Sequence, residues 1–253
     1  MNNKGSITLV GAGPGDPELI TLKAVKAIET ASVIFYDALI SPALLNYNSK
    51  AEKIFVGKRS GSVHTPQSTI DQLIVKHALK GQNVVRLKGG DPLVFGRATE
   101  ELESAHLHNI STTIIPGISS YAGIAARHQI PITKRKAHQS FWVVTGHTED
   151  GKFADDLYLA AQSSATVIIL MGMKHLPEII ALFKKLKTKN YPVAIIQNGT
   201  TTAERSLVST IDKVVEEVES NEIKNPATLF FGPAVTDAVT KFKNPINALK
   251  CII

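Results

Sequence analysis

The chain has 253 residues, of which 43% are hydrophobic and 20% are charged, and this composition indicates a soluble globular protein. Its single cysteine, Cys251, excludes an intrachain disulfide and a cluster of thiolate metal ligands. The 28 Lys and Arg exceed the 22 Asp and Glu, and the net charge of +6 fits either an anionic partner or a lysine-rich solvated surface.

The first half of the chain alternates short apolar runs with amphipathic stretches. The apolar runs are typical of buried strands and cover 7–10, 33–36, 54–56, 84–87 and 113–115. The stretches between them are typical of helices and cover 21–30, 69–80 and 98–108. Residues 1–6 do not resemble the start of a signal peptide, because the apolar run that follows them covers only 7–10. A cytoplasmic location is therefore expected.

The second half repeats this alternation. Strands are predicted at 141–145, 166–171, 193–197 and 227–231, and helices at 121–127, 176–186 and 211–219. The pattern predicts an α/β protein with largely parallel strands and helices on both faces. We expect two lobes, 1–117 and 118–240, with a ligand cleft between them, and a peripheral tail, 241–253.

Three glycine-containing loops follow predicted strands. The first, Gly11-Ala12-Gly13-Pro14-Gly15-Asp16, lacks the G-x-G-x-x-G spacing of dinucleotide sites. The second is Lys88-Gly89-Gly90-Asp91-Pro92 and the third is Pro116-Gly117-Ile118-Ser119-Ser120. Glycine lets a backbone approach a ligand closely, so together the loops predict a site for a polar cofactor. The alternative for each loop is a plain tight turn.

Charged side chains stand near the ends of several predicted strands. Asp37 directly follows one, where α/β sheets place functional groups, although a turn or helix cap would also explain it. Lys58 and Arg59 follow another strand, and Arg97 and Arg135 lie near the glycine loops. Each cation alone is typical of a surface; together they predict a basic cleft that could bind carboxylates.

Several other chemistries lack their motifs. The histidines do not have the H-E-x-x-H or paired spacing of a metal site, so no metal is expected. The chain has neither a G-x-S-x-G elbow nor a phosphate-binding P-loop. Aromatic residues make up only 6%, which argues against a base-stacking platform for single-stranded nucleic acid.

Ten segments in order carry a family resemblance that runs from about Ser6 to Val235. They read VGAGPGDPELITLKA, FYDALIS, VGKRSG, RLKGGDPLVFGR, IIPGISS, IPITKR, VTGH, ILMGM, PVAIIQNGTT and PATLFFG. On these segments the chain resembles the tetrapyrrole methylases that use S-adenosylmethionine, and among them the uroporphyrinogen-III C-methyltransferases. The resemblance implies a two-lobed α/β fold, distinct from Rossmann-type methyltransferases, with the cofactor between the lobes.

The resemblance also implies roles for single residues. Asp37 matches the family's proposed proton acceptor and Lys58 its proposed proton donor. The positions that match cofactor contacts are Pro14, Gly89, Gly90, Asp91, Val94, Ser119, Ser120, Met171, Gly199 and Ala227. From the chemistry of a substrate rich in carboxylates, rather than from the motifs, we assign Arg59, Arg97 and Arg135 to substrate binding.

The implied reaction methylates two pyrrole carbons of uroporphyrinogen III, giving precorrin-2 and S-adenosylhomocysteine, in siroheme- or cobalamin-type biosynthesis. The expected protein is a homodimer that binds neither nucleic acid nor membrane. The alternatives are methylation of a later corrin precursor, a nucleic-acid methyltransferase of the same fold, and a non-catalytic binding protein. The chain departs from the family pattern at Ala38, Ala98, Thr99 and Lys134, on the expected tetrapyrrole side, which weakens the substrate assignment slightly and leaves cofactor use intact.

Overall fold

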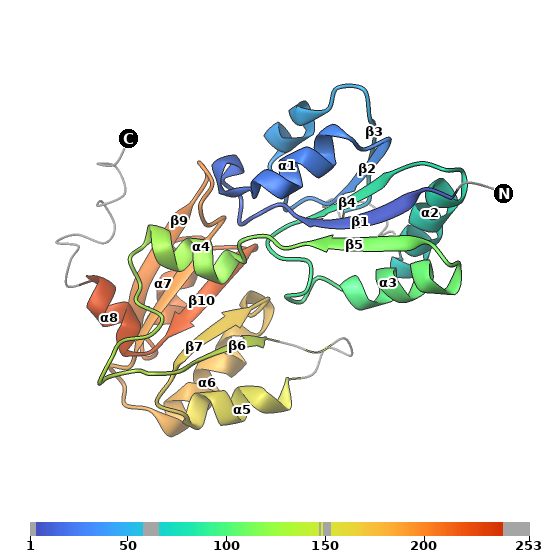
Figure 1. Cartoon of the computed structure of the whole chain (residues 1–253). Coiled ribbons are helices and arrows are strands. Elements are labelled where there is room, and N and C mark those ends of the chain that lie inside the picture. Colours follow the sequence, from blue (N-terminus) through green and yellow to red (C-terminus); the bar gives the residue numbers. More distant parts are fainter. Residues whose placement is uncertain (1–3, 58–65, 147, 149–152, 240–253) are drawn as a thin grey trace. The chain divides into compact units, whose positions relative to one another are not determined.

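The computed structural model describes residues 4–57, 66–146, 148 and 153–239 (Figure 1). The chain forms two compact units, one ending at Gly123 and the next beginning at Ile124. Both units combine a five-stranded sheet with helices, so the predicted α/β class is confirmed. The lobe boundary expected after residue 117 stays a prediction, and the expected tail, 241–253, lies outside the described residues.

The first unit is built on a parallel sheet with the strand order β3-β2-β4-β1-β5. Its strands are β1 (Ser6–Gly11), β2 (Val33–Tyr36), β3 (Glu52–Phe55), β4 (Val84–Lys88) and β5 (Ser111–Ile115). Every neighbouring pair is parallel, so all five strands end at the same edge. The central strand, β4, is buried along its whole length, as expected of a parallel strand covered on both faces.

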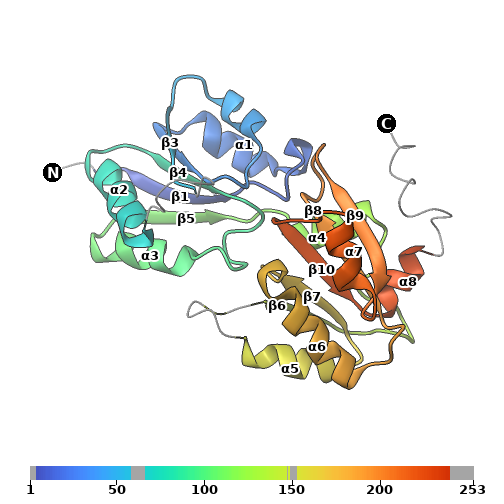
Figure 2. The same cartoon turned by 180° about the vertical axis from the view of Figure 1, so that it is seen from behind.

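Helices cover both faces of this sheet (Figures 1 and 2). On one face, α1 (Leu22–Glu29) and the 3₁₀ turn η2 (Pro42–Tyr47) bury Ile28 and Leu44 against Ile34 and Leu87. On the other face lie α2 (Gln67–Leu79) and α3 (Ala98–Leu107), and their core includes Ile74 and Ala105. The alternation of side chains along a strand explains why successive residues of β4 enter different cores.

The second unit has a mixed sheet with the strand order β6-β7-β10-β8-β9. Its strands are β6 (Phe141–Thr145), β7 (Thr166–Leu170), β8 (Pro192–Gln197), β9 (Arg205–Thr210) and β10 (Ala227–Phe231). Only β6 and β7 are parallel; the other three pairs are antiparallel. The prediction of largely parallel strands is therefore right for the first unit and wrong for this one.

The connection between β8 and β9 explains part of this correction. It spans only 198–204, and a parallel pair needs a crossover of about a dozen residues or more. Strand β9 itself was not predicted, because four of the six residues in its sequence, RSLVST, are polar and the strand lies at an edge with only Leu207 buried. A search for apolar runs does not find such a strand.

Helices of the second unit pack mainly on one face of its sheet. The core there joins α5 (Asp155–Gln162), α6 (Leu176–Leu186) and α7 (Val214–Ser220) to the strands, and includes the stacked rings of Phe183 and Phe231, 4.2 Å apart. Helix α8 (Pro233–Val239) packs against β8 and β10. Helix α4 (Ser120–Arg127) and the turn η3 (Met173–His175) complete the described elements. Within the described ranges, no helix has the length and apolar character needed to cross a membrane.

Candidate active site

The first two glycine loops meet at the carboxyl edge of the parallel sheet. Gly90 N donates to Gly13 O at 2.7 Å, and Gly13 N donates to Gly90 O at 3.3 Å. Both residues have positive φ, +79° at Gly13 and +68° at Gly90. Residues other than glycine rarely adopt a positive φ, so this backbone conformation explains why glycine occupies both positions.

Asp91 of the second loop holds the third loop in place. The Asp91 Oδ2 accepts a hydrogen bond from Gly117 N at 3.1 Å, and its Oδ1 accepts one from Leu93 N at 2.8 Å. We call Gly13, Gly90 and Gly117, with the Asp91 carboxylate, the glycine clamp. The family resemblance implied a cofactor contact at Asp91, and within the described structure its carboxylate accepts backbone hydrogen bonds from Leu93 and from Gly117 of the third loop.

Close packing of backbones explains two further glycines that the site prediction left out. A Cβ atom on Gly117 would lie 2.7 Å from Gly11 Cα, and one on Gly11 would lie 2.8 Å from Gly90 O. Any side chain at either position would force the strand ends apart. The signal in the sequence is a glycine as the last residue of β1, directly opposite Lys88 in the register of β1 and β4.

The other predicted cofactor residues of this unit border the glycine clamp. A Cβ atom on Gly89 would lie 2.8 Å from Leu39 Cβ, and one on Gly123 would lie 2.6 Å from Pro14 Cγ. Ser119 is buried and its carbonyl accepts hydrogen bonds from the first turn of α4, which begins at Ser120. Val94 is half-buried, and Val94 N donates to Asp91 O at 3.2 Å.

Asp37 lies at the same sheet edge, directly after β2. Its Oδ1 accepts a hydrogen bond from Leu39 N at 2.9 Å, which is the local turn cap that the sequence offered as an alternative. Its Oδ2 lies 3.6 Å from Arg86 Nη1, and the side chain is 22% exposed. The Asp37 carboxylate therefore caps the local turn through Oδ1, and solvent can still reach the side chain. Lys58 and Arg59 lie outside the described residues.

Behind Asp37 lies a cluster of charged side chains that the sequence analysis did not single out. Arg86 Nε is 3.0 Å from Glu101 Oε1, and Lys88 Nζ is 2.8 Å from Glu101 Oε2. All three residues are at most 5% exposed. Burial, followed by the positive charge of Arg86, lowers the pKa of Lys88. Two cations within an otherwise apolar strand were the available signal, because buried charges require partners.

The two remaining arginines predicted to bind substrate lie in different units. Arg97 has φ +55° and forms an exposed ion pair with Glu100, with Nε and Oε1 2.9 Å apart. Arg135 is exposed and belongs to the second unit. The neighbouring Lys134 contacts both carboxylate oxygens of Asp237 at 3.0 Å. This departure from the family pattern thus holds the segment to α8.

The cofactor residues predicted in the second unit gather at one edge of its sheet. Strand β10 pairs Thr228 with Leu170 and Ala227 with Gln197, which brings Ala227 close to the ends of β7 and β8. Met171 directly follows β7 at φ +56° with 43% exposure. Gly199 follows β8, and a Cβ atom there would collide with the Ile124 side chain.

A buried carboxylate shapes the loop that contains Gly199. Glu204 Oε2 accepts a hydrogen bond from Thr200 N at 2.5 Å, and its Oε1 lies 3.1 Å from both Arg127 Nε and His128 Nε2. Thr200 has φ +68°, which is rare for a β-branched residue. Burial raises the pKa of Glu204, but the hydrogen bonds from His128 and Thr200 outweigh it and hold that pKa below its ordinary value.

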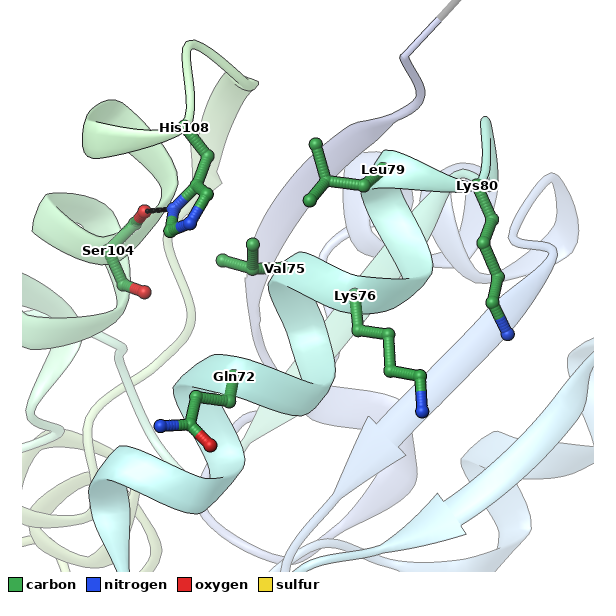
Figure 3. Close-up of a pocket in the computed structure, with 7 residues that line it drawn as sticks. All are labelled: Gln72, Val75, Lys76, Leu79, Lys80, Ser104 and His108. Carbon is green, nitrogen blue, oxygen red and sulfur yellow. Dashed lines mark hydrogen bonds between the residues drawn. The ribbon is translucent and has the colours of Figure 1, made fainter.

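A separate pocket of about 320 Å³ lies between α2 and α3. Figure 3 shows Val75 and Leu79 directed toward His108, with the amines of Lys76 and Lys80 directed away from it. The ends of α2 and α3 lead into β4 and β5, so this pocket lies toward the opposite edge of the sheet from the glycine clamp. None of the residues that line it was predicted as a site residue. Among the described residues, no group of three or more His, Cys, Asp or Glu is placed to hold a metal ion.

The fold and these loops define a class of enzyme: the chain belongs to the tetrapyrrole (corrin/porphyrin) methylase family, which it matches over residues 6–215. It is 44% identical to the uroporphyrinogen-III C-methyltransferase of Methanocaldococcus jannaschii over 234 residues, covering 91% of this chain and 97% of that protein. It is 42% identical to the siroheme synthase of Azotobacter vinelandii over 236 residues, with 91% of this chain covered, and spans only 50% of that protein's length.

Solved structures agree with this assignment. A uroporphyrin-III C-methyltransferase from Thermus thermophilus, complexed with S-adenyl homocysteine, is 34% identical with a TM-score of 0.79 and covers 92% of this chain and 100% of that one. A cobalt precorrin-4 methyltransferase, 22% identical with a TM-score of 0.81, shares the fold and covers 91% of this chain and 95% of that one. The predicted family, with its methyltransferase class and its fold, is confirmed.

Proposed function

We propose that this chain transfers methyl groups from S-adenosylmethionine to two pyrrole carbons of uroporphyrinogen III, giving precorrin-2 for siroheme- or cobalamin-type biosynthesis. The observation that carries the proposal is the meeting of three glycine loops beside Asp37 at one sheet edge. The 44% identity to the Methanocaldococcus jannaschii enzyme, across 97% of its length, supports the choice of substrate.

The residues around the glycine clamp fit a polar cofactor. A side chain on Gly89 would strike Leu39, and the Gly90 amide and carbonyl both bond to Gly13, so the loop is compact and carries no side chain at these two positions. We assign to cofactor binding Pro14, Gly89, Gly90, Asp91, Val94, Ser119 and Ser120 of the first unit, and Met171, Gly199 and Ala227 of the second. S-adenosylmethionine, when bound, supplies the methyl group as a sulfonium.

Asp37 is proposed as the proton acceptor. A pyrrole carbon that gains a methyl group must lose a proton from the ring system, and a positioned carboxylate can accept it. Leu39 N holds Oδ1, while Oδ2 faces Arg86 from 3.6 Å, longer than a strong charge-assisted hydrogen bond. Oδ2 thus keeps capacity to take the proton. Lys58 is proposed as the proton donor, by family resemblance alone.

Binding of the substrate carboxylates is assigned to Arg59, Arg97 and Arg135. Arg97 already pairs with Glu100 at the surface, and exchange of one carboxylate for another costs little at such an exposed site. Lys134, which pairs with Asp237, was not among the residues predicted to bind substrate and is not assigned to it. We also propose that the protein is a cytoplasmic homodimer that binds neither nucleic acid nor membrane. Sedimentation would test the oligomeric state, and a gel-shift titration would test nucleic-acid binding.

The decisive experiment is anaerobic incubation with uroporphyrinogen III and S-adenosylmethionine, followed by mass spectrometry of the oxidised pigments. We expect a gain of two methyl groups together with S-adenosylhomocysteine. Asp37→Asn in the same assay should bind S-adenosylhomocysteine normally and lose most of the methylation. Unmethylated pigment from a preparation that binds the cofactor tightly would overturn the proposed substrate.

A further inference from the structure

Arg86, Lys88 and Glu101, which we call the buried ion cluster, connect the interior of the first unit to Asp37. Arg86 and Lys88 lie two residues apart on β4, so both side chains leave the same face of the sheet, toward α3. Glu101 on α3 receives both cations, one on each carboxylate oxygen. Gln67 on α2 adds a longer hydrogen bond of 3.4 Å to Glu101 Oε1.

Asp37 adds a second carboxylate beside the buried ion cluster. Two cations, Arg86 and Lys88, face one buried carboxylate, so the buried ion cluster alone carries an excess of one positive charge. Asp37 is the second carboxylate, and Arg86 Nη1 approaches its Oδ2 at 3.6 Å. A buried charge without a partner costs several kcal/mol. The Asp37 carboxylate therefore faces the cation that the buried ion cluster leaves in excess.

The guanidinium of Arg86 makes its contacts in three directions. Its Nε binds Glu101, its Nη1 donates to Leu87 O at 2.9 Å, and the same Nη1 faces Asp37. A planar fork held in this way cannot rotate without losing a buried contact. Asp37 is in turn held at Oδ1 by Leu39 N, so both of its oxygens have a fixed neighbour.

We propose that Arg86 is a positioning residue, which holds the Asp37 carboxylate in one orientation at the sheet edge, and that Glu101 fixes Arg86 for this purpose. The inference rests on the proposed function, in which Asp37 accepts the proton. Arg86 is buried and its contacts are satisfied by protein groups, so it acts through Asp37 rather than through the substrate. Its loss should affect kcat much more than binding of S-adenosylmethionine.

A double-mutant cycle on kcat tests this dependence, with Arg86→Gln, Asp37→Asn and the double variant. We expect each single variant to lower kcat by about tenfold or more, with KM for S-adenosylmethionine within about twofold of wild type. In the Asp37→Asn background, Arg86→Gln should change kcat by less than about twofold. An equal loss in both backgrounds would mean that Arg86 contributes to structure generally, and would overturn the inference.

Two further variants guard against a folding defect. Arg86→Lys keeps the charge but lacks the fork, so we expect it to fold and still to lose kcat; if Arg86→Gln does not fold, the cycle is run with Arg86→Lys. Lys187→Gln removes another partly buried cation, which donates to Ser163 O at 2.7 Å in the second unit, and should leave kcat unchanged. A wild-type protein that does not methylate uroporphyrinogen III refutes the proposed function, whereas active wild type with an additive cycle refutes only the role of Arg86.

Discussion

At the scale of single residues, the glycines of the clamp differ in what makes them necessary. An added Cβ on Gly90 would make only ordinary van der Waals contacts, the nearest with Ser120 N at 3.6 Å, but the φ of +68° disfavours a side chain. Gly117 has no such torsional requirement, yet its Cβ would strike the backbone of Gly11 at 2.7 Å. One position is constrained by conformation and the other by packing.

This difference predicts an order of effects for alanine substitutions. Gly90→Ala should cost about 1 kcal/mol of stability, because only the left-handed backbone is penalised. Gly117→Ala must move the strand ends apart and should weaken S-adenosylhomocysteine binding more strongly. Calorimetric titration and thermal unfolding measure both, with the exposed Lys80→Ala as control. Wild-type affinity in Gly117→Ala would show that the close approach is not needed.

Glu204 predicts a pH dependence of stability. Its folded-state pKa lies below the ordinary value of 4.5, because hydrogen bonds from His128 and Thr200 outweigh the effect of burial. It therefore stabilises the fold above about pH 4.5, and this contribution is lost as pH falls through the lowered pKa. Glu204→Gln should unfold more easily than wild type at pH 7.

The stability difference between Glu204→Gln and wild type should shrink steadily below about pH 4.5. Urea unfolding at a series of pH values measures it, and the exposed Glu219→Gln serves as the control. A difference that stays constant from pH 7 to acid would contradict the role of the ionised carboxylate.

At the scale of elements, one side chain joins the segments around α1 and β3. Asn48 Nδ2 donates to the carbonyls of Ile28, Glu29 and Ala31, and its Oδ1 accepts from Lys50 N and Ala51 N. The residue is 8% exposed, so water cannot replace these bonds freely. It holds the end of α1 against the turn that leads into β3.

Asn48→Ala should destabilise the protein by about 3 kcal/mol, because it leaves several buried backbone groups without partners. Asn46→Ala, two residues earlier and exposed, is the matched control and should change stability by less than about 0.5 kcal/mol. Chemical denaturation of the two variants gives the comparison. Equal stability of both would show that the buried amide makes no net contribution to stability.

At the scale of the whole molecule, the net charge of +6 is the relevant property. The proposed substrate carries many carboxylates, and attraction between opposite charges in water weakens as salt screens them. Raising ionic strength should therefore raise KM for uroporphyrinogen III while kcat stays nearly constant. KM for S-adenosylmethionine, whose sulfonium and ammonium outweigh its single carboxylate, is the internal control. A KM for the porphyrinogen that does not change with salt would show that the positive net charge does not contribute to substrate binding.

The elements that sequence patterns predicted correctly are those set by local periodicity. The predicted 176–186 helix and the 33–36 strand match α6 and β2. Strand β9 was not predicted because only Leu207 and Val208 in it are apolar, and helix α5 was missed although Leu157, Ala160 and Ala161 follow helical spacing. The glycine loops and Asp37 were predicted from their positions after strands, whereas Arg86 and Glu101 were not, since their pairing joins a strand to a helix 15 residues later.

The sequence by itself determined the family, the α/β class, the parallel sheet of the first unit and the loops expected to hold the cofactor, because each depends on short segments with a local physical requirement. Only the tertiary structure decided the antiparallel pairings of the second sheet, the use of the Asp91 carboxylate to hold Gly117, and the ionic contact behind Asp37. These features join residues far apart in the chain, and no local pattern specifies which distant partner will satisfy a buried charge or a sheet edge.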